Sequence, residues 1–270
     1  MNDKDVQYLE KKAFGGDTNA QCQIGDIYFF DGETEEEWRR AAYWYRIAAR
    51  HGNAEAQYNL GYQYEHGIGV EEDRSMAGTW YRKAAEQAYG PAENNLGHLY
   101  ESGWSAGQDY IQALYWYERA GRHDDSDGQC NAGIMYQFGY TGIQDDKKAA
   151  YWYSKAARQN NYIAQNNLGY LYETGRGVVQ DYRKASYWYQ KAALAGDGPA
   201  QNNLGQLYRD GRGVAQDVCQ AAYWFSLSAE NGYLEGIKNY ANACEKGIGM
   251  IADPEQAAYW RRQAEWINRK

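Results

Sequence analysis

The residue types that usually carry catalysis or metal binding are present in this sequence, but their spacing assembles no site. The histidines are His51, His66, His98 and His123. They form no His-Glu-x-x-His motif, and none stands at ligand spacing from a cysteine, so zinc is not indicated. The run from Asp125 to Gly128 resembles a calcium loop, but His123 and Ile134 occupy its first and twelfth ligand positions. We therefore expect no enzymatic activity and no cofactor, with an enzyme or metal-binding protein as the remote alternative.

Glycine pairs and cysteines lead to the same expectation. Pairs such as Gly175 and Gly177 follow a helical pattern and lack the third glycine of a dinucleotide-binding loop, so they are turn residues. The cysteines do not recur in pairs within repeats, as a disulfide framework would require. They are Cys22, Cys130, Cys219 and Cys244. We expect reduced, mostly buried thiols in a cytoplasmic protein.

Composition bounds the class of partner. The formal net charge is −8 and the pI is near 5.1, which argues against nucleic acid because phosphates require a basic surface. No stretch approaches the ~18 apolar residues of a membrane span, and the N-terminus has neither the basic start nor the apolar run of a signal peptide. We expect a cytoplasmic protein, monomeric on its own, whose partner is not a membrane.

A 36-residue repeat organises the chain and must position any binding residue. Seven tryptophans mark it, and six glycines with Ala241 and six aspartates preceded by Glu37 keep the same step. The three columns are Trp44, Trp80, Trp116, Trp152, Trp188, Trp224 and Trp260; Gly25, Gly61, Gly97, Gly133, Gly169 and Gly205; and Asp73, Asp109, Asp145, Asp181, Asp217 and Asp253. The prediction is one solenoid domain of seven repeats over residues 17–268, preceded by a capping half-repeat helix over residues 1–16.

Each repeat is predicted to form two helices. Residues 164–172 place apolar side chains at helical spacing, and residues 185–192 form the facing stripe. Gly169 lies inside the first helix, where close approach of a neighbouring helix would explain the missing side chain. Gly175 is expected to end that helix and Asp181 to cap the next one.

Two aromatic columns are expected to differ in burial. The tryptophans are assigned to the core together with a tyrosine column, namely Tyr28, Tyr64, Tyr100, Tyr136, Tyr172 and Tyr208. A second column precedes each tryptophan and lies off the core stripe. It contains Tyr43, Tyr115, Tyr151, Tyr187, Tyr223 and Tyr259, and we expect it to lie along the outer face.

The repeated pattern Asn-Leu-Gly-x-x-Tyr-x-x-Gly-x-Gly-Val, followed by Asp, Ala, Trp-Tyr and Ala-Ala, resembles the Sel-1-like repeat, a relative of the tetratricopeptide repeat. The resemblance covers nearly the whole chain in seven in-phase copies. It implies an all-α fold, a right-handed α-solenoid whose first helices line a concave groove. It also implies an adaptor or scaffold role without catalysis.

If first helices line a groove, their columns predict the contact residues. An amide column offers a donor and an acceptor in each repeat, either for a bound peptide or only for neighbouring helices. Its central members are Asn59, Asn95, Asn131, Asn167 and Asn203. A variable column that includes Tyr62, His98 and Tyr170 could set specificity. Acidic residues, among them Glu65, Glu101 and Glu173, outnumber basic ones on this surface and favour a basic protein or peptide partner.

The turns between paired helices carry residue types that are common in binding hot spots. Trp104, Tyr140, Arg176 and Arg212 follow the glycine that ends each first helix. Around the turns of repeats three and four the pattern changes, and Gly121, Gly128 and Ala132 replace larger residues. This predicts a weak joint that could act as a hinge, with local sequence drift as the alternative.

The sequence therefore predicts a non-enzymatic, cytoplasmic protein–protein interaction module. An adaptor or scaffold is the primary interpretation. An immunity protein that neutralises a cognate toxin is the alternative, because an acidic groove could cover a basic active site.

Overall fold

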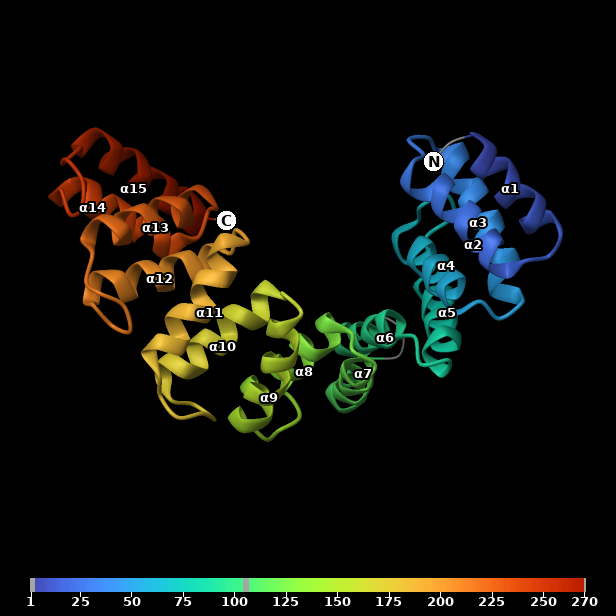
Figure 1. The fold of residues 1–270 in the computed structure, drawn as a ribbon, viewed down its shortest axis with the longest axis horizontal. Helices are drawn as coiled ribbons and strands as arrows, with labels where there is room; N and C mark the ends of the chain where they lie inside the picture. Colours follow the sequence, from blue (N-terminus) through green and yellow to red (C-terminus); the bar gives the residue numbers. More distant parts are fainter. Residues whose placement is uncertain (1–2, 104–106, 270) are drawn as a thin grey trace. The chain divides into compact units, whose positions relative to one another are not determined.

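A computed structural model describes residues 3–103 and 107–269, which form helices joined by short turns (Figure 1). This part of the chain contains fifteen helices and no strand. α1 (Asp3–Phe14) precedes seven pairs. The first helices are α2 (Thr18–Phe30), α4 (Ala54–His66), α6 (Gly90–Ser102), α8 (Ser126–Phe138), α10 (Tyr162–Thr174), α12 (Gly198–Asp210) and α14 (Leu234–Lys246). The second helices are α3 (Glu35–Arg50), α5 (Arg74–Glu86), α7 (Tyr110–Arg122), α9 (Asp146–Arg158), α11 (Tyr182–Leu194), α13 (Val218–Glu230) and α15 (Pro254–Asn268).

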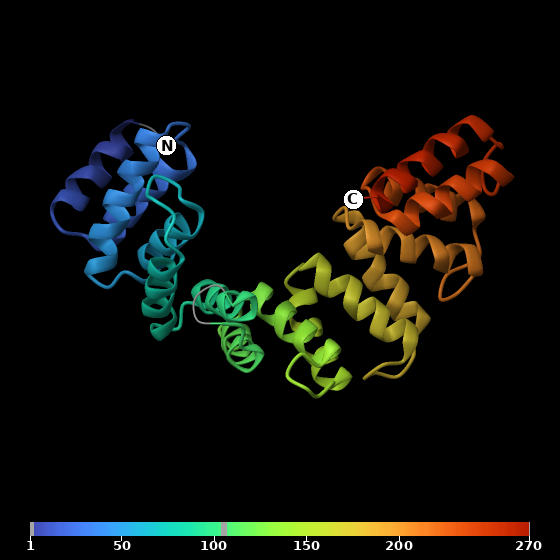
Figure 2. The same ribbon diagram turned by 180° about the vertical axis from the view of Figure 1, so that it is seen from behind.

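The helices form two compact units, residues 1–132 and 133–270. Within each unit, helices pack against their partner in the repeat and against the next helix along the chain, as Figure 2 shows from behind. First helices of neighbouring repeats also contact each other, α2 with α4 and α12 with α14. The all-α prediction of tandem helix pairs is confirmed. One continuous domain and a weak joint between repeats three and four stay predictions.

The capping residues explain where the helices begin and end. Asp181 accepts hydrogen bonds from the backbone N–H groups of Arg183 and Lys184, as expected for an N-cap. Gly175 ends α10 at φ 72°, a left-handed conformation that suits glycine. Repeat one differs, because Thr34 and Glu37 form a reciprocal capping box that starts α3 earlier. Glu37 is thus not itself the cap that its column predicts.

The core is built around a tyrosine column that the sequence only partly indicates. The tryptophans of most repeats are buried, as predicted. In five repeats a tyrosine follows the tryptophan and is almost without solvent exposure; this column contains Tyr45, Tyr81, Tyr117, Tyr153 and Tyr189. The column assigned to the core, which begins at Tyr28, is mostly half-buried, and Tyr136 is its buried member. That assignment is therefore only partly correct.

The glycine column accommodates these buried rings. A Cβ atom on Gly169 would lie 2.7 Å from Cδ1 of Tyr189, which is closer than carbon atoms can approach. The close approach predicted from the sequence is therefore real, but the neighbour is a ring from the second helix of the same repeat. In repeat seven Arg261 replaces the ring, and Ala241 stands where the other repeats have glycine.

Two contacts within unit 1 show how neighbouring repeats pack on each other. α1 packs on α2, and the amide of Gln21 donates a hydrogen bond to the carbonyl of Ala13 at 2.9 Å. A Cβ atom on Gly128 would lie 2.5 Å from Cβ of Ala120, so this glycine permits close helix packing. Close packing within unit 1 therefore explains why glycine stands at position 128, where most repeats have alanine.

Candidate functional site

The asparagine column of the first helices bonds neighbouring helices to each other. Asn59 donates to Asp26 at 3.1 Å, and two further members donate to asparagines of the preceding first helix, Asn131 to Asn94 at 2.9 Å and Asn203 to Asn166 at 3.1 Å. Asn95 accepts from Asn94 at 3.4 Å. All five predicted members, Asn167 included, are half-buried. The helix-bonding interpretation of this column thus has direct support, and a peptide-binding role stays a prediction.

The predicted acidic contacts have internal partners as well. Glu65, Glu101 and Glu173 accept hydrogen bonds from the hydroxyls of buried tyrosines sixteen residues later. The O···O distances are 2.6 Å for Tyr81 to Glu65, 2.5 Å for Tyr117 to Glu101 and 2.8 Å for Tyr189 to Glu173. Burial and the adjacent carboxylate raise the pKa of these tyrosines, so each hydroxyl stays protonated and donates.

Substitutions in the other repeats follow the same pairing. In repeat four Gln137 replaces the glutamate and accepts from Tyr153 at 2.6 Å. In repeat six the ring is Phe225, which has no hydroxyl, and Arg209 stands at the acidic position. In repeats two to six the residue at this position therefore matches whether the buried ring has a hydroxyl hydrogen to donate. In repeat one the position holds Phe29, and Tyr45 donates to Asp26 instead.

This pairing changes the expected result of reversing these charges. The sequence suggests that lysine at Glu65, Glu101 and Glu173 would leave stability almost unchanged. We now expect Glu101→Lys to lower the free energy of unfolding by about 1–3 kcal/mol, because the buried hydroxyl of Tyr117 loses its acceptor. Glu101→Gln, which copies repeat four, should change it by less than about 0.5 kcal/mol. Urea denaturation followed by tryptophan fluorescence checks both, and equal losses would contradict the structural role.

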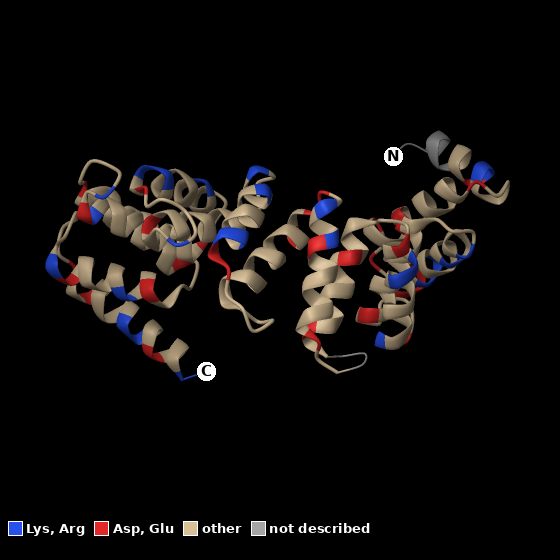
Figure 3. Cartoon of the chain, turned by 90° about the horizontal axis from the view of Figure 1, so that it is seen from below, with Lys and Arg blue, Asp and Glu red and all other residues tan. Residues whose placement is uncertain are grey.

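Carboxylates on the first helices differ in charge pairing between the two units, and Figure 3 marks their positions. In unit 2, Glu173 and Asp210 lie 3.0 and 3.1 Å from Arg212. Glu235 pairs with Lys238 at 2.6 Å and Glu245 pairs with Arg261. In unit 1, four carboxylates have no Lys or Arg partner within 4.0 Å among the described residues; they are Asp26, Glu55, Glu65 and Glu101. We call these four the acidic face.

Two members of the acidic face, Asp26 and Glu55, have raised pKa values. Burial raises the pKa of Asp26, although a hydrogen bond from Tyr45 at 2.8 Å opposes the shift. Burial and the charge of Asp26 together raise the pKa of Glu55. A nearby cation would favour the charged form of both groups. The acidic face is thus suited to a positively charged ligand.

The variable column is placed less uniformly. The ring of Tyr62 stacks on His66 with centroids 4.1 Å apart and meets Phe29 edge-on. His98 and Tyr170 are exposed on α6 and α10. Surface exposure is compatible with the predicted contact role of His98 and Tyr170, whereas Tyr62 is half-buried.

The predicted turn residues fall into two groups. Arg176 makes a bidentate ion pair with Asp146, with both N–O distances 3.0 Å, and Arg212 pairs with Glu173. These arginines therefore link successive repeats. Tyr140 is exposed, and its ring lies 6.0 Å from that of Phe138. Trp104 lies outside the described residues.

Sequence reasoning missed a cluster in repeat three that is centred on the buried Glu93. Glu93 has no solvent exposure and lies 2.8 Å from Nε of Arg119 and 2.7 Å from Nδ1 of His123. The same column holds glutamine in five repeats, where its amide donates to a backbone carbonyl eight residues earlier. In repeat three that carbonyl, on Ala85, accepts from Arg119 at 3.0 Å instead. The sequence signal that could have indicated this cluster is Glu93 itself, the single acid in a column that holds glutamine in five repeats.

Residues with metal-binding or thiol chemistry form no further site in the described ranges. No group of three or more His, Cys, Asp or Glu side chains there could hold a metal ion. All four cysteines are free; Cys22, Cys130 and Cys244 are buried and Cys219 is exposed. Burial raises the pKa of Cys130 to about 12. No helix in residues 3–103 or 107–269 is long and apolar enough to cross a bilayer.

Comparison with known proteins agrees with the repeat boundaries. The family model described as Sel1 repeat matches residues 18–53, 54–89, 90–125, 126–161, 163–197, 198–233 and 235–264. No curated protein sequence matches the chain.

Several solved structures share the architecture. The chain is 35 % identical to c5321, a protective antigen of uropathogenic Escherichia coli with an SLR fold, over 97 % of this chain and 56 % of that one, with a TM-score of 0.86. It thus spans little more than half of that antigen. A Sel1 repeat protein from Oxalobacter formigenes is 30 % identical over 90 % of this chain and 96 % of its own, with a TM-score of 0.79. Immunity protein PA5088 from Pseudomonas aeruginosa is 22 % identical over 79 % and 82 %, with a TM-score of 0.53, and shares the fold.

Proposed function

This chain belongs to the Sel1 repeat family, whose members are generally protein-interaction modules, and we propose that it is a cytoplasmic adaptor whose acidic face holds a basic segment of a partner protein. The proposal includes no reaction and no cofactor. Its partner is a lysine- or arginine-rich helix, tail or loop.

One observation carries this proposal. The acidic face places four carboxylates on the consecutive first helices α2, α4 and α6 with no Lys or Arg partner within 4.0 Å in the described part of the chain, whereas comparable carboxylates of unit 2 are neutralised by arginine or lysine. An uncompensated cluster attracts and orients a ligand of opposite charge. Asn95 and His98 lie on α6 and are included in the proposed contact surface. Tyr62, on α4, belongs to the same proposed contact surface.

The test neutralises charge without removing hydrogen-bond acceptors. We expect Asp26→Asn, Glu55→Gln, Glu65→Gln and Glu101→Gln together to weaken binding of a fluorescein-labelled nona-arginine peptide about tenfold, because four ion pairs formed at the protein surface contribute roughly 0.3–0.5 kcal/mol each. The control variant combines Glu173→Gln, Asp210→Asn, Glu235→Gln and Glu245→Gln. It changes net charge equally and should alter affinity less than twofold. Fluorescence anisotropy at low salt measures both, and equal losses would show only a non-specific charge effect.

The pH dependence supplies a second arm of the same experiment. Because the pKa values of Asp26 and Glu55 are raised, these groups lose charge at a higher pH than ordinary carboxylates as the solution is acidified. Peptide affinity should therefore fall early during acidification in the wild type. The Asp26→Asn and Glu55→Gln variant should lack that early part of the decrease.

The immunity-protein alternative would use the same acidic face to cover the basic active site of a toxin. This chain shares its fold with immunity protein PA5088. The immunity role is that of PA5088, and for this chain it is a proposal. Co-expression with a toxin encoded beside the gene separates the two roles. Rescue of growth by the wild type and its loss in the neutralised variant would favour the immunity role over an adaptor.

A further inference from the structure

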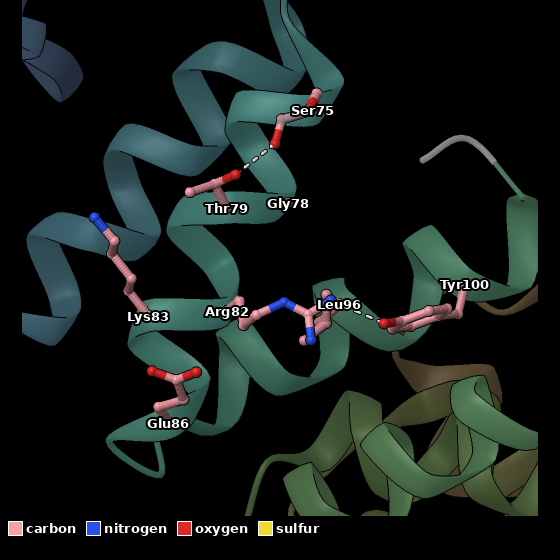
Figure 4. A pocket seen from close by; sticks show the side chains of 8 residues that line it. All are labelled: Ser75, Gly78, Thr79, Arg82, Lys83, Glu86, Leu96 and Tyr100. Atoms are coloured by element: carbon pink, nitrogen blue, oxygen red, sulfur yellow. Dashed lines mark hydrogen bonds between the residues drawn. The ribbon is translucent and has the colours of Figure 1, made fainter. Parts of the chain in front are cut away.

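A pocket of about 400 Å³ lies between α5 and α6 in unit 1 (Figure 4). Its α5 wall consists of Ser75, Gly78, Thr79, Arg82, Lys83 and Glu86, and its α6 wall of Leu96 and Tyr100. None of these residues belongs to the acidic face. The pocket therefore calls for an explanation that does not depend on the proposed function.

The pocket occurs where one repeat lacks a tyrosine. Six repeats place a tyrosine before the tryptophan of the second helix, half exposed (48–57 %), with its ring edge-on to that tryptophan at centroid distances of 4.9–5.5 Å. In repeat two the position is Thr79, whose hydroxyl donates to the carbonyl of Ser75 at 3.0 Å. Thr79 lines the pocket, so a larger side chain there would enter it.

A second substitution in the same repeat enlarges the space. Gly78 stands where four repeats have alanine, one has Leu114 and one has Ser186. A Cβ atom on Gly78 would meet only Cδ1 of Leu99, at an ordinary contact distance of 3.4 Å. Packing therefore does not require this glycine, although glycine is unfavourable inside a helix. Its effect is to leave the pocket open beside Thr79.

The walls of the pocket define the chemistry of an occupant. Leu96 and the ring of Tyr100 supply apolar surface, and the Tyr100 hydroxyl holds the guanidinium of Arg82 at 2.8 Å, as Figure 4 shows. The ammonium of Lys83 lies 4.2 Å from the centroid of the Trp80 ring. Arg82, Lys83 and Glu86 line the same pocket as Leu96 and Tyr100, so two cations and one carboxylate accompany its aromatic and aliphatic surface. This combination suits an aromatic ring with negative charge beside it.

We propose that this pocket binds an aromatic side chain of a protein partner, a tyrosine or phenylalanine flanked by acidic residues. The ring would take the place that the chain's own tyrosine has in six repeats. Arg82 and Lys83 would face the flanking carboxylates. This docking site is separate from the acidic face. It would bind a negatively charged segment, whereas the acidic face would bind a positively charged one.

The experiment uses the full chain and short peptides as probes. We expect acetyl-Glu-Tyr-Glu-amide to bind with a millimolar dissociation constant, as a fragment of this size should, and to shift NMR amide resonances of residues 75–86 and 96–100. Acetyl-Lys-Tyr-Lys-amide should bind at least threefold more weakly. Acetyl-Glu-Ala-Glu-amide should cause no shifts there.

Thr79→Tyr fills the pocket with the residue that six other repeats carry, so it should fold and lose peptide binding. Thr79→Ser keeps the pocket open and should bind as the wild type does. Unchanged binding by Thr79→Tyr would overturn the proposal. So would equal shifts from the alanine peptide on the wild type, a comparison that needs no variant. Binding of free tyrosine but not of the tyrosine peptide would overturn it in favour of a small-molecule site.

Discussion

Replacement of Gly169 by alanine should lower the free energy of unfolding by about 2–3 kcal/mol, the upper part of the range for overpacked cores. The added Cβ would lie 2.7 Å from Cδ1 of Tyr189, a ring with no solvent exposure that cannot rotate away within its packed site. The Tyr189 hydroxyl is also fixed by its hydrogen bond to Glu173. Displacing the ring would therefore disturb packing and hydrogen bonding together. Urea denaturation monitored by fluorescence and circular dichroism measures the loss.

Gly78→Ala is the matched control within the same chain. It makes the same chemical change inside a helix, but the added Cβ meets only Leu99 at 3.4 Å. We expect it to raise the free energy of unfolding by up to about 1 kcal/mol, because alanine is the better helix former. If both substitutions shifted stability in the same direction, contact with the buried ring would not be what keeps glycine at position 169.

A second large effect is expected at Glu93. Glu93→Ala should lower the free energy of unfolding by about 2–4 kcal/mol, because it removes the buried carboxylate that pairs with Arg119 and hydrogen-bonds His123. The side chains of Arg119 and His123 remain 27 % and 37 % exposed. Water can therefore solvate them partly, which keeps the loss below the full value for a completely buried pair.

Glu93→Gln distinguishes the charge from the hydrogen bonds. Glutamine occupies this column in five other repeats. There its side chain can accept a hydrogen bond from an amide thirty residues later, as Gln57 does from Gln87 at 2.8 Å. The loss should be about half that of the alanine variant or less, since His123 and Arg119 keep a neutral acceptor. Equal losses in both variants would show that the negative charge, and not the acceptor, holds the cluster together.

The periodic features of the fold could be predicted because each recurs in six or seven repeats at the same 36-residue step. Helix pairs, the Asp181 cap and the Gly175 terminus follow from residue type at a fixed step. The depth of burial could not be predicted, because Trp188 and Tyr189 are adjacent on one helix and spacing alone does not say which ring points deeper. Thr34 could not be predicted as the cap of α3, because it lies three residues before Glu37, the member of the aspartate column in repeat one.

The candidate site was less predictable, because spacing identifies a surface and not the partners of its side chains. Glu65 and Glu101 were correctly placed on first helices, but their hydrogen bonds to buried tyrosines are set by packing. Arg176 and Arg212 were selected as exposed hot-spot types, yet they pair with acids of the preceding repeat. The exchange of tyrosine for Phe225 opposite Arg209 was the signal that could have shown the pairing.

The pairing of each buried ring with its glycine and its acceptor lies within one repeat, and this constrains how such genes can recombine. A crossover between repeats moves the ring, the glycine and the acceptor together, so the product keeps every match. A crossover between the two helices of a repeat separates them. Joining α12 to α11, for example, would set Arg209 opposite the hydroxyl of Tyr189 and leave that donor unsatisfied. Duplication and loss of whole 36-residue units are therefore the rearrangements that this architecture tolerates.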